Sequence, residues 1–567
     1  MKFSLLFPNN SERRFAVLTD EAVNDLSLEF ILDALTEERA ERPHLLSIMK
    51  RIPSEPETIR YRRDIFDDFL RFPKLREAMS DLVKRLSDLR DLERFQKDAD
   101  ASALWSLINR LREIDDYMSC INMIKDTLTG LDISSSGMRE LRDYVTEIPR
   151  ESGFDELKAD IDELMTKARR LKSITIGVNL DKLLRPEAAG VVALNDEKFS
   201  DAGLMGRFSS FVDSKNEINH GLDKGESGRF SPENPPTTGF LMGATTFNTA
   251  INGSHIETST VTGKDPLSNA LRKTVTDIMR RTVKDIKSTI KKYVDFSGYS
   301  LINLMPEILF YIRWAELTEK ILTTGMPMCK PQITSYESRD CSFKGVYNLK
   351  LAINKVKGES INIIDNDFEF SDEHRIYILT GPNRGGKTIF TQAIGLAMLL
   401  AQWGVYVPAG EAVISPCDNI FTHFPADEND TVDLGRLGEE SQRLSKIFET
   451  ATRHSLLLLN ESLATTSVAE GVFIAKDVVR VMRYLGTRAI FNTHMHELAA
   501  SVRDINDEVE GDSRAESLIT GVHNGERSFK VFIAPPQGVS YAADIAKKYG
   551  VTFEQMKNTV DSNKTND

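Results

Sequence analysis

Cysteine is scarce in this sequence, and its four cysteines, Cys120, Cys329, Cys341 and Cys417, are scattered over 567 residues. They form no C-x-x-C pair and have no histidine at the spacing of a structural zinc site. Reduced thiols in a cytosolic protein are the simplest interpretation. The sequence therefore predicts neither a disulfide framework nor a zinc-stabilised domain, and we expect a cytoplasmic location.

Long hydrophobic runs are also missing. The apolar start of the chain, residues 1–8, is too short for a signal peptide. The longest apolar stretch, residues 393–407, is interrupted by Gln402 and Gly404, so it is typical of a helix, a turn and a strand. We therefore expect no membrane-spanning segment.

Basic residues are the minority charge, with 72 Lys and Arg against 85 Asp and Glu, a net charge of −13. This balance excludes a protein that coats nucleic acid over its whole surface, so any such contact must be local. One strongly basic helical stretch, residues 272–292, could follow a phosphate backbone. It could equally be a solvated face that pairs with acidic helices. The candidate DNA-binding residues are Arg280, Arg281, Lys284 and Lys287.

The length and the 41% hydrophobic content allow three or four domain-sized units. Helical periodicity dominates residues 20–172, and alternating short apolar runs and helices follow residue 342. We predict an α+β multidomain protein, with an all-α N-terminal core and lever helices before a C-terminal α/β P-loop NTPase domain. The predicted divisions are a helical core at 1–135, levers at 136–300 with a flexible insertion near 195–266, a helical connector at 301–341 and the NTPase domain at 342–567.

A buried-strand pattern at residues 375–380 runs directly into a glycine-rich loop, and a helix-favouring stretch follows to about Trp403. In such loops the backbone N–H groups point at phosphate oxygens, a lysine reaches the β and γ phosphates, and a hydroxyl ligates Mg²⁺. The sequence therefore predicts a site for ATP and Mg²⁺. Its candidate cofactor-binding residues are Gly381, Pro382, Asn383, Arg384, Gly385, Gly386, Lys387 and Thr388.

Two further buried strands are predicted at residues 456–459 and 488–492, and polar residues follow each of them. Ligand chemistry in open α/β sheets lies at the carboxyl ends of the strands, so these residues are expected near the loop. Glu461 is placed to polarise an attacking water, and His494 to hydrogen-bond a terminal phosphate. Both are candidate catalytic residues. His494 could instead be an ordinary strand-end histidine, and a metal site built from it and its neighbours lacks a third ligand.

Several motifs occur together in a fixed order. They are Thr380-Gly-Pro-Asn-Arg-Gly-Gly-Lys-Thr388, Tyr406-Val-Pro-Ala-Gly410, Leu459-Asn-Glu-Ser462, Thr465-Thr-Ser467, and Asn492-Thr-His-Met-His-Glu-Leu498, with Ser540-Tyr541 near the C-terminus. This combination resembles the ATPase domain of the MutS family. The helical N-terminal half is similar, less closely, to that family's core and lever helices.

The resemblance implies a homodimer whose ATPase domains pack head to tail, with levers that extend toward DNA. Asn460 stands where the family has a carboxylate, and Thr388 and Asn460 are the candidate metal ligands. Gly435 and Arg436 occupy the positions that face the partner's nucleotide, although the surrounding segment departs from the family's signature. The family's base-stacking positions fall near Ile363 and Ile533, neither of which is aromatic.

Two functions remain open at this point. The first is a DNA-associated ATPase of the MutS type, acting on branched or structured DNA in repair or recombination. Because the chain starts almost directly in the helical core, we expect no mismatch-reading domain and no preference for mismatched duplex. The second is an ATP-binding switch or scaffold that acts on protein partners and hydrolyses ATP slowly or not at all. The neutral Asn460 favours the second function, and Glu461 and His494 favour the first.

Overall fold

The computed structural model describes residues 3–8, 14–96, 104–151 and 301–536, apart from short gaps at 383, 425–434, 464–467 and 524–525. It also describes most of 173–195, scattered positions in 156–166, residues 226–227 and 284, and most of 547–564. The chain forms two compact units. The first contains residues 1–80, 131–141 and 304–567, and the second contains residues 81–130 and 142–303. No helix in the described part is long and apolar enough to cross a membrane.

The N-terminal part of the first unit is helical and packs around one long buried helix, α13 (Met305–Thr323). Eleven residues of α13 are buried, among them Trp314, whose ring lies 5.8 Å from that of Trp403. The elements around it are β1 (Ala16–Val17), α1 (Asp20–Asp25), α2 (Leu28–Leu35), α3 (Arg42–Met49), β2 (Arg51–Ile52) and α4 (Pro56–Arg71). A short 3₁₀ helix, η2 (Ile302–Leu304), directly precedes α13 in the chain.

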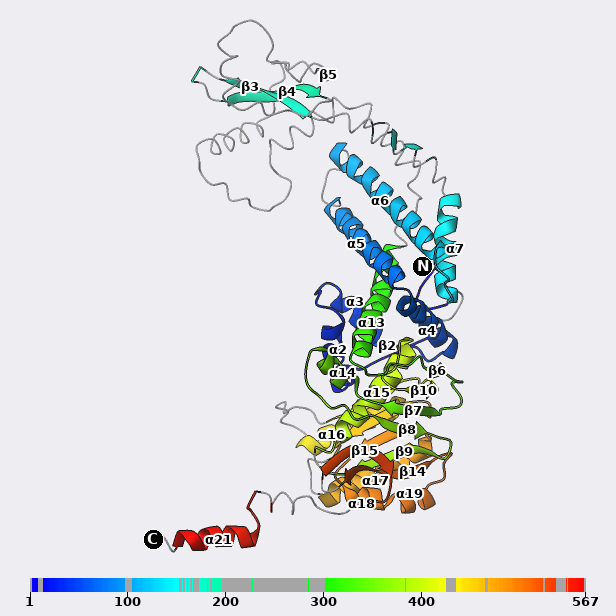
Figure 1. Ribbon diagram of the computed structural model, residues 1–567, viewed down its shortest axis with the longest axis vertical. Coiled ribbons are helices and arrows are strands. Elements are labelled where there is room, and N and C mark those ends of the chain that lie inside the picture. The colour runs from blue at the N-terminus through cyan, green and yellow to red at the C-terminus, as the bar shows by residue number, and fades with distance from the viewer. Residues whose placement is uncertain are drawn as a thin grey trace. The chain divides into compact units, whose positions relative to one another are not determined.

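A six-stranded sheet follows, in the order β11-β12-β13-β9-β14-β15. Three of its strands, β9, β14 and β15, are labelled in Figure 1. All neighbours are parallel except β14 and β15, which form an antiparallel pair at one edge. The central strands are almost wholly buried, as near-continuous apolar runs in a parallel sheet require. The strands are β9 (His374–Thr380), β11 (Ile420–His423), β12 (Leu456–Asn460), β13 (Arg488–Asn492), β14 (Arg514–His523) and β15 (Glu526–Ile533).

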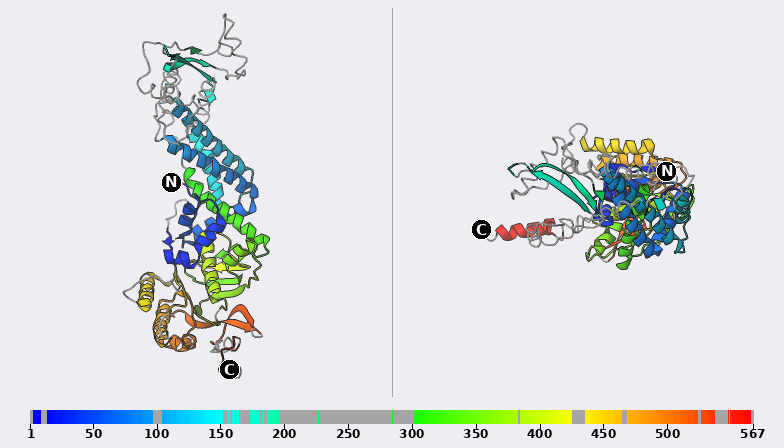
Figure 2. Two further views of the ribbon diagram at one scale, coloured as in Figure 1. Left: turned by 90° about the vertical axis from the view of Figure 1, so that its left-hand side faces the viewer. Right: turned by 90° about the horizontal axis from the view of Figure 1, so that it is seen from above.

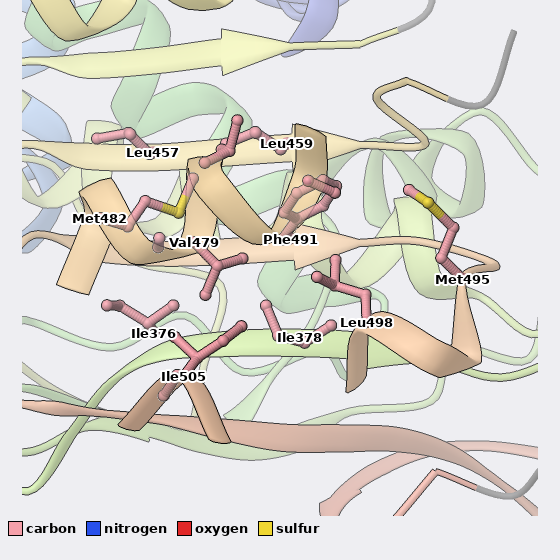
Figure 3. Close-up of a cluster of buried hydrophobic side chains, with 14 of the residues drawn as sticks. Ile376, Ile378, Leu457, Leu459, Val479, Met482, Phe491, Met495, Leu498 and Ile505 are labelled. Carbon is pink, nitrogen blue, oxygen red and sulfur yellow. The ribbon is translucent and has the colours of Figure 1, made fainter. Parts of the chain in front are cut away.

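Helices cover both faces of this sheet. Leu457 and Leu459 point to the face whose core also contains Val479 and Leu498 (Figure 3). Leu458, one residue out of step, meets α15 on the opposite face, where a Cβ added at Gly395 would lie 2.6 Å from its side chain. The helices are α15 (Lys387–Trp403), α16 (Gly435–Thr450), α17 (Val468–Leu485), α18 (His496–Ala500) and α19 (Val502–Glu508).

A second, four-stranded sheet has the order β6-β10-β7-β8, in which only the β6–β10 pair is parallel. The sequence predicted a mostly parallel α/β pattern and did not indicate this sheet. Its strands are β6 (Gln332–Ile333), β7 (Cys341–Val346), β8 (Asn366–Phe370) and β10 (Glu411–Ile414), and α14 (Leu349–Val356) lies between β7 and β8 in the chain. A separate helix, α21 (Phe553–Lys564), lies near the end of the chain.

Helix α15 joins the loop before it to the N-terminal helices. It ends at Gly404 (φ +79°), where an added Cβ would lie 2.3 Å from the Cβ of Arg62 and 2.7 Å from the backbone nitrogen of Arg63, both in α4. Gln402 donates a hydrogen bond to the carbonyl of Pro53 at 2.9 Å. The C-terminal end of α15 is therefore in direct contact with α4.

The second unit contains helices and a small antiparallel sheet, β3-β4-β5, drawn in teal in Figure 2. Its strands are β3 (Ser173–Leu180), whose residues alternate between apolar and polar, β4 (Pro186–Asn195) and β5 (Glu226–Ser227). The predicted loose insertion lies almost entirely outside the described residues. The helices are α5 (Pro73–Gln96), which begins in the first unit, α6 (Leu104–Thr129) and α7 (Ser136–Glu151), whose first turns belong to the first unit. The four-part domain division stays a prediction.

Candidate nucleotide site

The loop between β9 and α15 is a tight backbone cradle. Gly381 (φ +145°) and Gly386 (φ +86°) have backbone angles that favour glycine. A Cβ at Gly381 would lie 2.1 Å from the Oγ1 of Thr520, and one at Gly385 would lie 2.8 Å from the carbonyl oxygen of Pro382. The hydroxyl of Thr520 is buried and has no hydrogen-bond partner in the described part of the chain. The loop therefore has the shape and polarity that suit a phosphate group; Asn383 lies outside the described residues.

Lys387 is the first residue of α15 and is buried. Its ammonium donates to the carbonyl oxygens of Gly381 and Pro382 at 3.1 and 3.2 Å, so the side chain folds back over the loop. Burial lowers the pKa of Lys387, and the nearby Glu461 carboxylate raises it. A phosphate placed in the cradle would offer this cation stronger acceptors than the two carbonyls.

Thr388 and Asn460, the two candidate metal ligands, lie side by side. The Thr388 hydroxyl donates to the Oδ1 of Asn460 at 2.9 Å. Asn492, paired with Asn460 across β12 and β13, also donates its amide to that oxygen. The Oδ1 of Asn492 is buried and accepts no hydrogen bond from the described residues, which suits a water of a metal's coordination shell. These oxygen donors fit Mg²⁺ chemically, but all of them are neutral.

Glu461 follows β12 and faces the same edge. Its Oε1 accepts a hydrogen bond from the Nε2 of His494 at 2.7 Å. This bond, together with the charges of His494 and Lys387, lowers the pKa of Glu461 against the opposing effect of burial. The carboxylate is therefore ionised at neutral pH, as a group that polarises water must be. His494 thus contacts the Glu461 carboxylate. The hydrogen bond from His494 to a terminal phosphate stays a prediction.

A cavity of about 320 Å³ opens beside the loop. Its lining joins the phosphate-loop residues and Glu461 to Phe529 of β15 and to Ile364. Ile364 is next to one of the positions predicted for base stacking, and Phe529, four residues before the other, supplies the aromatic ring that neither predicted position has. The remaining lining residues are Val346, Tyr347, Asn348, Leu351, Asn362, Asn366, Ile389, Phe390 and Ala393.

Two residues that the sequence did not single out, His423 and Glu440, lie next to the turn after β12. His423 contacts Ser462 with 2.6 Å between Nδ1 and Oγ, and burial lowers the pKa of His423 to about 4. Glu440 of α16 accepts a hydrogen bond from the backbone N–H of Leu463 at 2.6 Å. The sequence shows that these residue types can form hydrogen bonds, but it does not show their partners, because the partners come from elements far apart in the sequence.

The remaining predicted residues are placed only in part. Gly435 and Arg436 are the first two residues of α16, and the side chain of Arg436 lies outside the described part. Lys284 is helical and exposed. Arg280, Arg281 and Lys287 lie outside the described residues, so the basic stretch stays a prediction.

A glycine cradle lies between β9 and α15, lysine and hydroxyl residues follow it, and a carboxylate follows β12 at the same edge of the sheet. These features define a P-loop nucleoside-triphosphatase domain. Comparison with known families agrees. Residues 377–534 match MutS domain V, and residues 54–324 match the MutS2 N-terminal domain. The chain belongs to the MutS family.

Curated relatives match parts of the chain. The chain is 33% identical over 201 residues to the DNA mismatch repair protein MutS of Oleidesulfovibrio alaskensis, covering 33% of this chain and 21% of that protein. It is 27% identical over 300 residues to MutS of Shouchella clausii, covering 51% and 33%. It is 28% identical over 194 residues to the Endonuclease MutS2 of Thermus thermophilus, covering 34% and 25%. The matched segments span a third or less of these relatives' lengths.

Proposed function

We propose that this chain is an ATPase of the MutS type that binds ATP and Mg²⁺ in the cradle after β9. One observation carries the proposal: Lys387, Thr388 and Asn460 meet Glu461 at the carboxyl edge of a single sheet. The ammonium would hold the β and γ phosphates, and Thr388 with Asn460 would hold the ion. Bound Mg²⁺ neutralises developing phosphate charge. Glu461 would then orient and polarise the attacking water, with His494 keeping its carboxylate ionised and in place.

The test separates binding from turnover. We expect Lys387→Ala to lose nucleotide affinity, because the cradle then offers no side-chain ammonium to the phosphates. Glu461→Gln should keep ATP binding but hydrolyse it at least about a hundredfold more slowly, the usual size of a lost general base. Lys344→Ala, at an exposed ion pair with Glu411, is the control and should match wild type. Equal turnover in wild type and Glu461→Gln, measured on contaminant-free protein, would remove the catalytic assignment.

We propose further that the working form is an ATP-stabilised homodimer. Relatives named MutS support this, and Gly435 and Arg436 stand where the family's trans-acting segment lies. Sedimentation of the Glu461→Gln protein should show a dimer with ATP and less dimer without it. A strictly monomeric species with ATP at working concentrations would contradict this.

The proposed target is structured or branched DNA, with a role in repair or recombination. The names of the relatives support it, as does the basic stretch that contains Arg280, Arg281, Lys284 and Lys287. Binding to duplex, single-stranded and junction DNA should weaken steeply with salt, and reversing these four charges should flatten that dependence by about one unit of slope for each lost phosphate contact. Salt-independent binding, or unchanged binding by the charge-reversed variant, would argue against this surface.

The neutral Asn460 supports a second candidate function, an ATP-binding switch that acts on protein partners with little or no hydrolysis. A single-turnover measurement decides between the two. Bound ATP that stays intact in wild type for as long as in Glu461→Gln favours the switch, and faster loss in wild type favours the ATPase.

A further inference from the structure

The turn that carries Glu461 has an unusual backbone. Glu461 (φ +52°) and Leu463 (φ +63°) are both in the left-handed region although neither is glycine. Such a conformation is unfavourable for residues with a side chain, and it persists only where the surroundings impose it. The direction in which the Glu461 carboxylate leaves the backbone therefore depends on what holds this turn.

Three successive residues of the turn are each held by a different element. The backbone N–H of Glu461 donates to the carbonyl of Asn492 in β13 at 2.8 Å. The Ser462 hydroxyl contacts His423 in β11 through both Nδ1, at 2.6 Å, and the carbonyl oxygen, at 3.1 Å. The backbone N–H of Leu463 donates to the Glu440 carboxylate at 2.6 Å. Strands β11 and β13 belong to the sheet, so the contacts of Glu461 and Ser462 are fixed to its frame.

The third contact is different, because Glu440 belongs to α16. This helix begins with Gly435 and Arg436, the positions proposed to meet the partner's nucleotide, and it packs on the sheet through the buried Leu444. Arg443 adds a hydrogen bond to the carbonyl of Phe424 at 3.2 Å. The first turns of α16 and the turn after β12 are thus linked through one carboxylate and one backbone N–H.

We propose that Glu440 is a positioning residue for hydrolysis, which couples the place of α16 to the orientation of Glu461. This inference rests on the proposed ATPase function and deepens it. When α16 is packed against the sheet, the Glu440 carboxylate holds the Leu463 N–H. This contact stabilises the left-handed turn, so that Glu461 faces the cradle. When α16 is displaced, the turn loses this contact and the carboxylate loses its fixed direction. The partner subunit's nucleotide, by seating α16, would thereby control turnover without contacting Glu461.

The test uses the full chain with Glu440→Ala, Glu440→Gln, and Glu449→Ala as a control at an exposed position on the same helix. Glu440→Ala should lower kcat by about tenfold, equivalent to about 1.4 kcal/mol, with KM and ATP affinity close to wild type. Glu440→Gln keeps an oxygen acceptor for the Leu463 N–H and should recover most of the rate. Glu449→Ala should match wild type. Wild-type kcat in Glu440→Ala, or a loss in Glu440→Ala that Glu440→Gln does not recover, would overturn the proposal.

A second measurement does not need turnover. Hydrogen exchange at the Leu463 amide should become about tenfold faster in Glu440→Ala and stay near wild type in Glu440→Gln, with and without ATP present. Unchanged exchange in Glu440→Ala would overturn the coupling, whatever the ATPase assay shows. If wild type neither binds nor hydrolyses ATP, the proposed function fails, and the exchange result still decides whether Glu440 holds the turn.

Discussion

The hydroxyl of Thr388 and the amide oxygen of Asn460 lie 2.9 Å apart, one at the start of α15 and the other at the end of β12. An ion held between phosphates and this pair would meet anionic oxygens on the phosphate side, but only neutral oxygens from Thr388 and Asn460. A carboxylate at the Asn460 position would add a full negative charge beside a divalent cation, where electrostatic attraction is strong.

Asn460→Asp should therefore tighten Mg²⁺ binding. We expect half-activation of ATP hydrolysis at a Mg²⁺ concentration several-fold below that of wild type. Without metal, the affinity for nucleotide should not rise, because the added carboxylate repels the phosphates. A Mg²⁺ titration of the ATPase rate checks this. Asn354→Asp, on α14 and outside the cavity lining, is a control for the added charge. If the two titrations of wild type and Asn460→Asp superimpose, Asn460 does not take part in metal binding.

His494→Ala should change the pH dependence of turnover. The hydrogen bond from His494 lowers the pKa of Glu461, so the working carboxylate persists to lower pH in wild type. Without the imidazole this pKa rises toward its usual value, and the acid limb of the kcat profile should move to higher pH. His44→Ala, at an exposed histidine, should leave the profile in place. An acid limb that does not move would show that His494 has no influence on this ionisation.

Phe529→Ala should weaken ATP binding by about three- to tenfold, because an aromatic ring that stacks on a base contributes about 0.5–1.5 kcal/mol. Phe529 lines the cavity, whereas Phe532 on the same strand is similarly exposed but does not. Phe532→Ala is therefore the matched control. Fluorescent-nucleotide titrations give both affinities, and equal losses in the two variants would mean that the effect is on β15 and not on the base.

His423 should make the protein less stable in mild acid. Because burial lowers its folded-state pKa from 6.5 to about 4, the unfolded chain takes up the proton first as the pH falls. Stability attributable to this group is fully present above about pH 6.5, and up to about 3 kcal/mol of it is lost as the pH falls to 4. His423→Gln should have a smaller pH slope of the thermal midpoint in this window. Parallel slopes in wild type and variant would contradict the buried neutral imidazole.

The strand–loop–helix unit was predicted almost residue by residue. Helix α15 has the predicted bounds, and β9 and β13 agree with the predicted strands to within a residue, because long buried apolar runs leave few alternatives. The order of the loop, Glu461 and His494 along one edge followed from the parallel sheet.

The contacts around that edge could not be read from the sequence. Asn492 reaches Asn460 only because β12 and β13 pair in that register. His423 meets Ser462, and Glu440 meets Leu463, only because β11 and α16 pack beside the turn. The second sheet was missed for a similar reason, since its short strands pair mainly in antiparallel fashion across long stretches of chain.

The close approach of Gly404 to the α4 backbone gives α15 a mechanical role. A helix of 17 residues is about 25 Å long and stiff along its axis. One end abuts the phosphate cradle, and the other leaves no room for even a methyl group before Arg62 and Arg63. Because no gap between Gly404 and α4 can absorb a shift, α15 acts as a rigid link between the cradle and α4. We expect any axial movement that starts at the cradle to arrive at α4 undiminished.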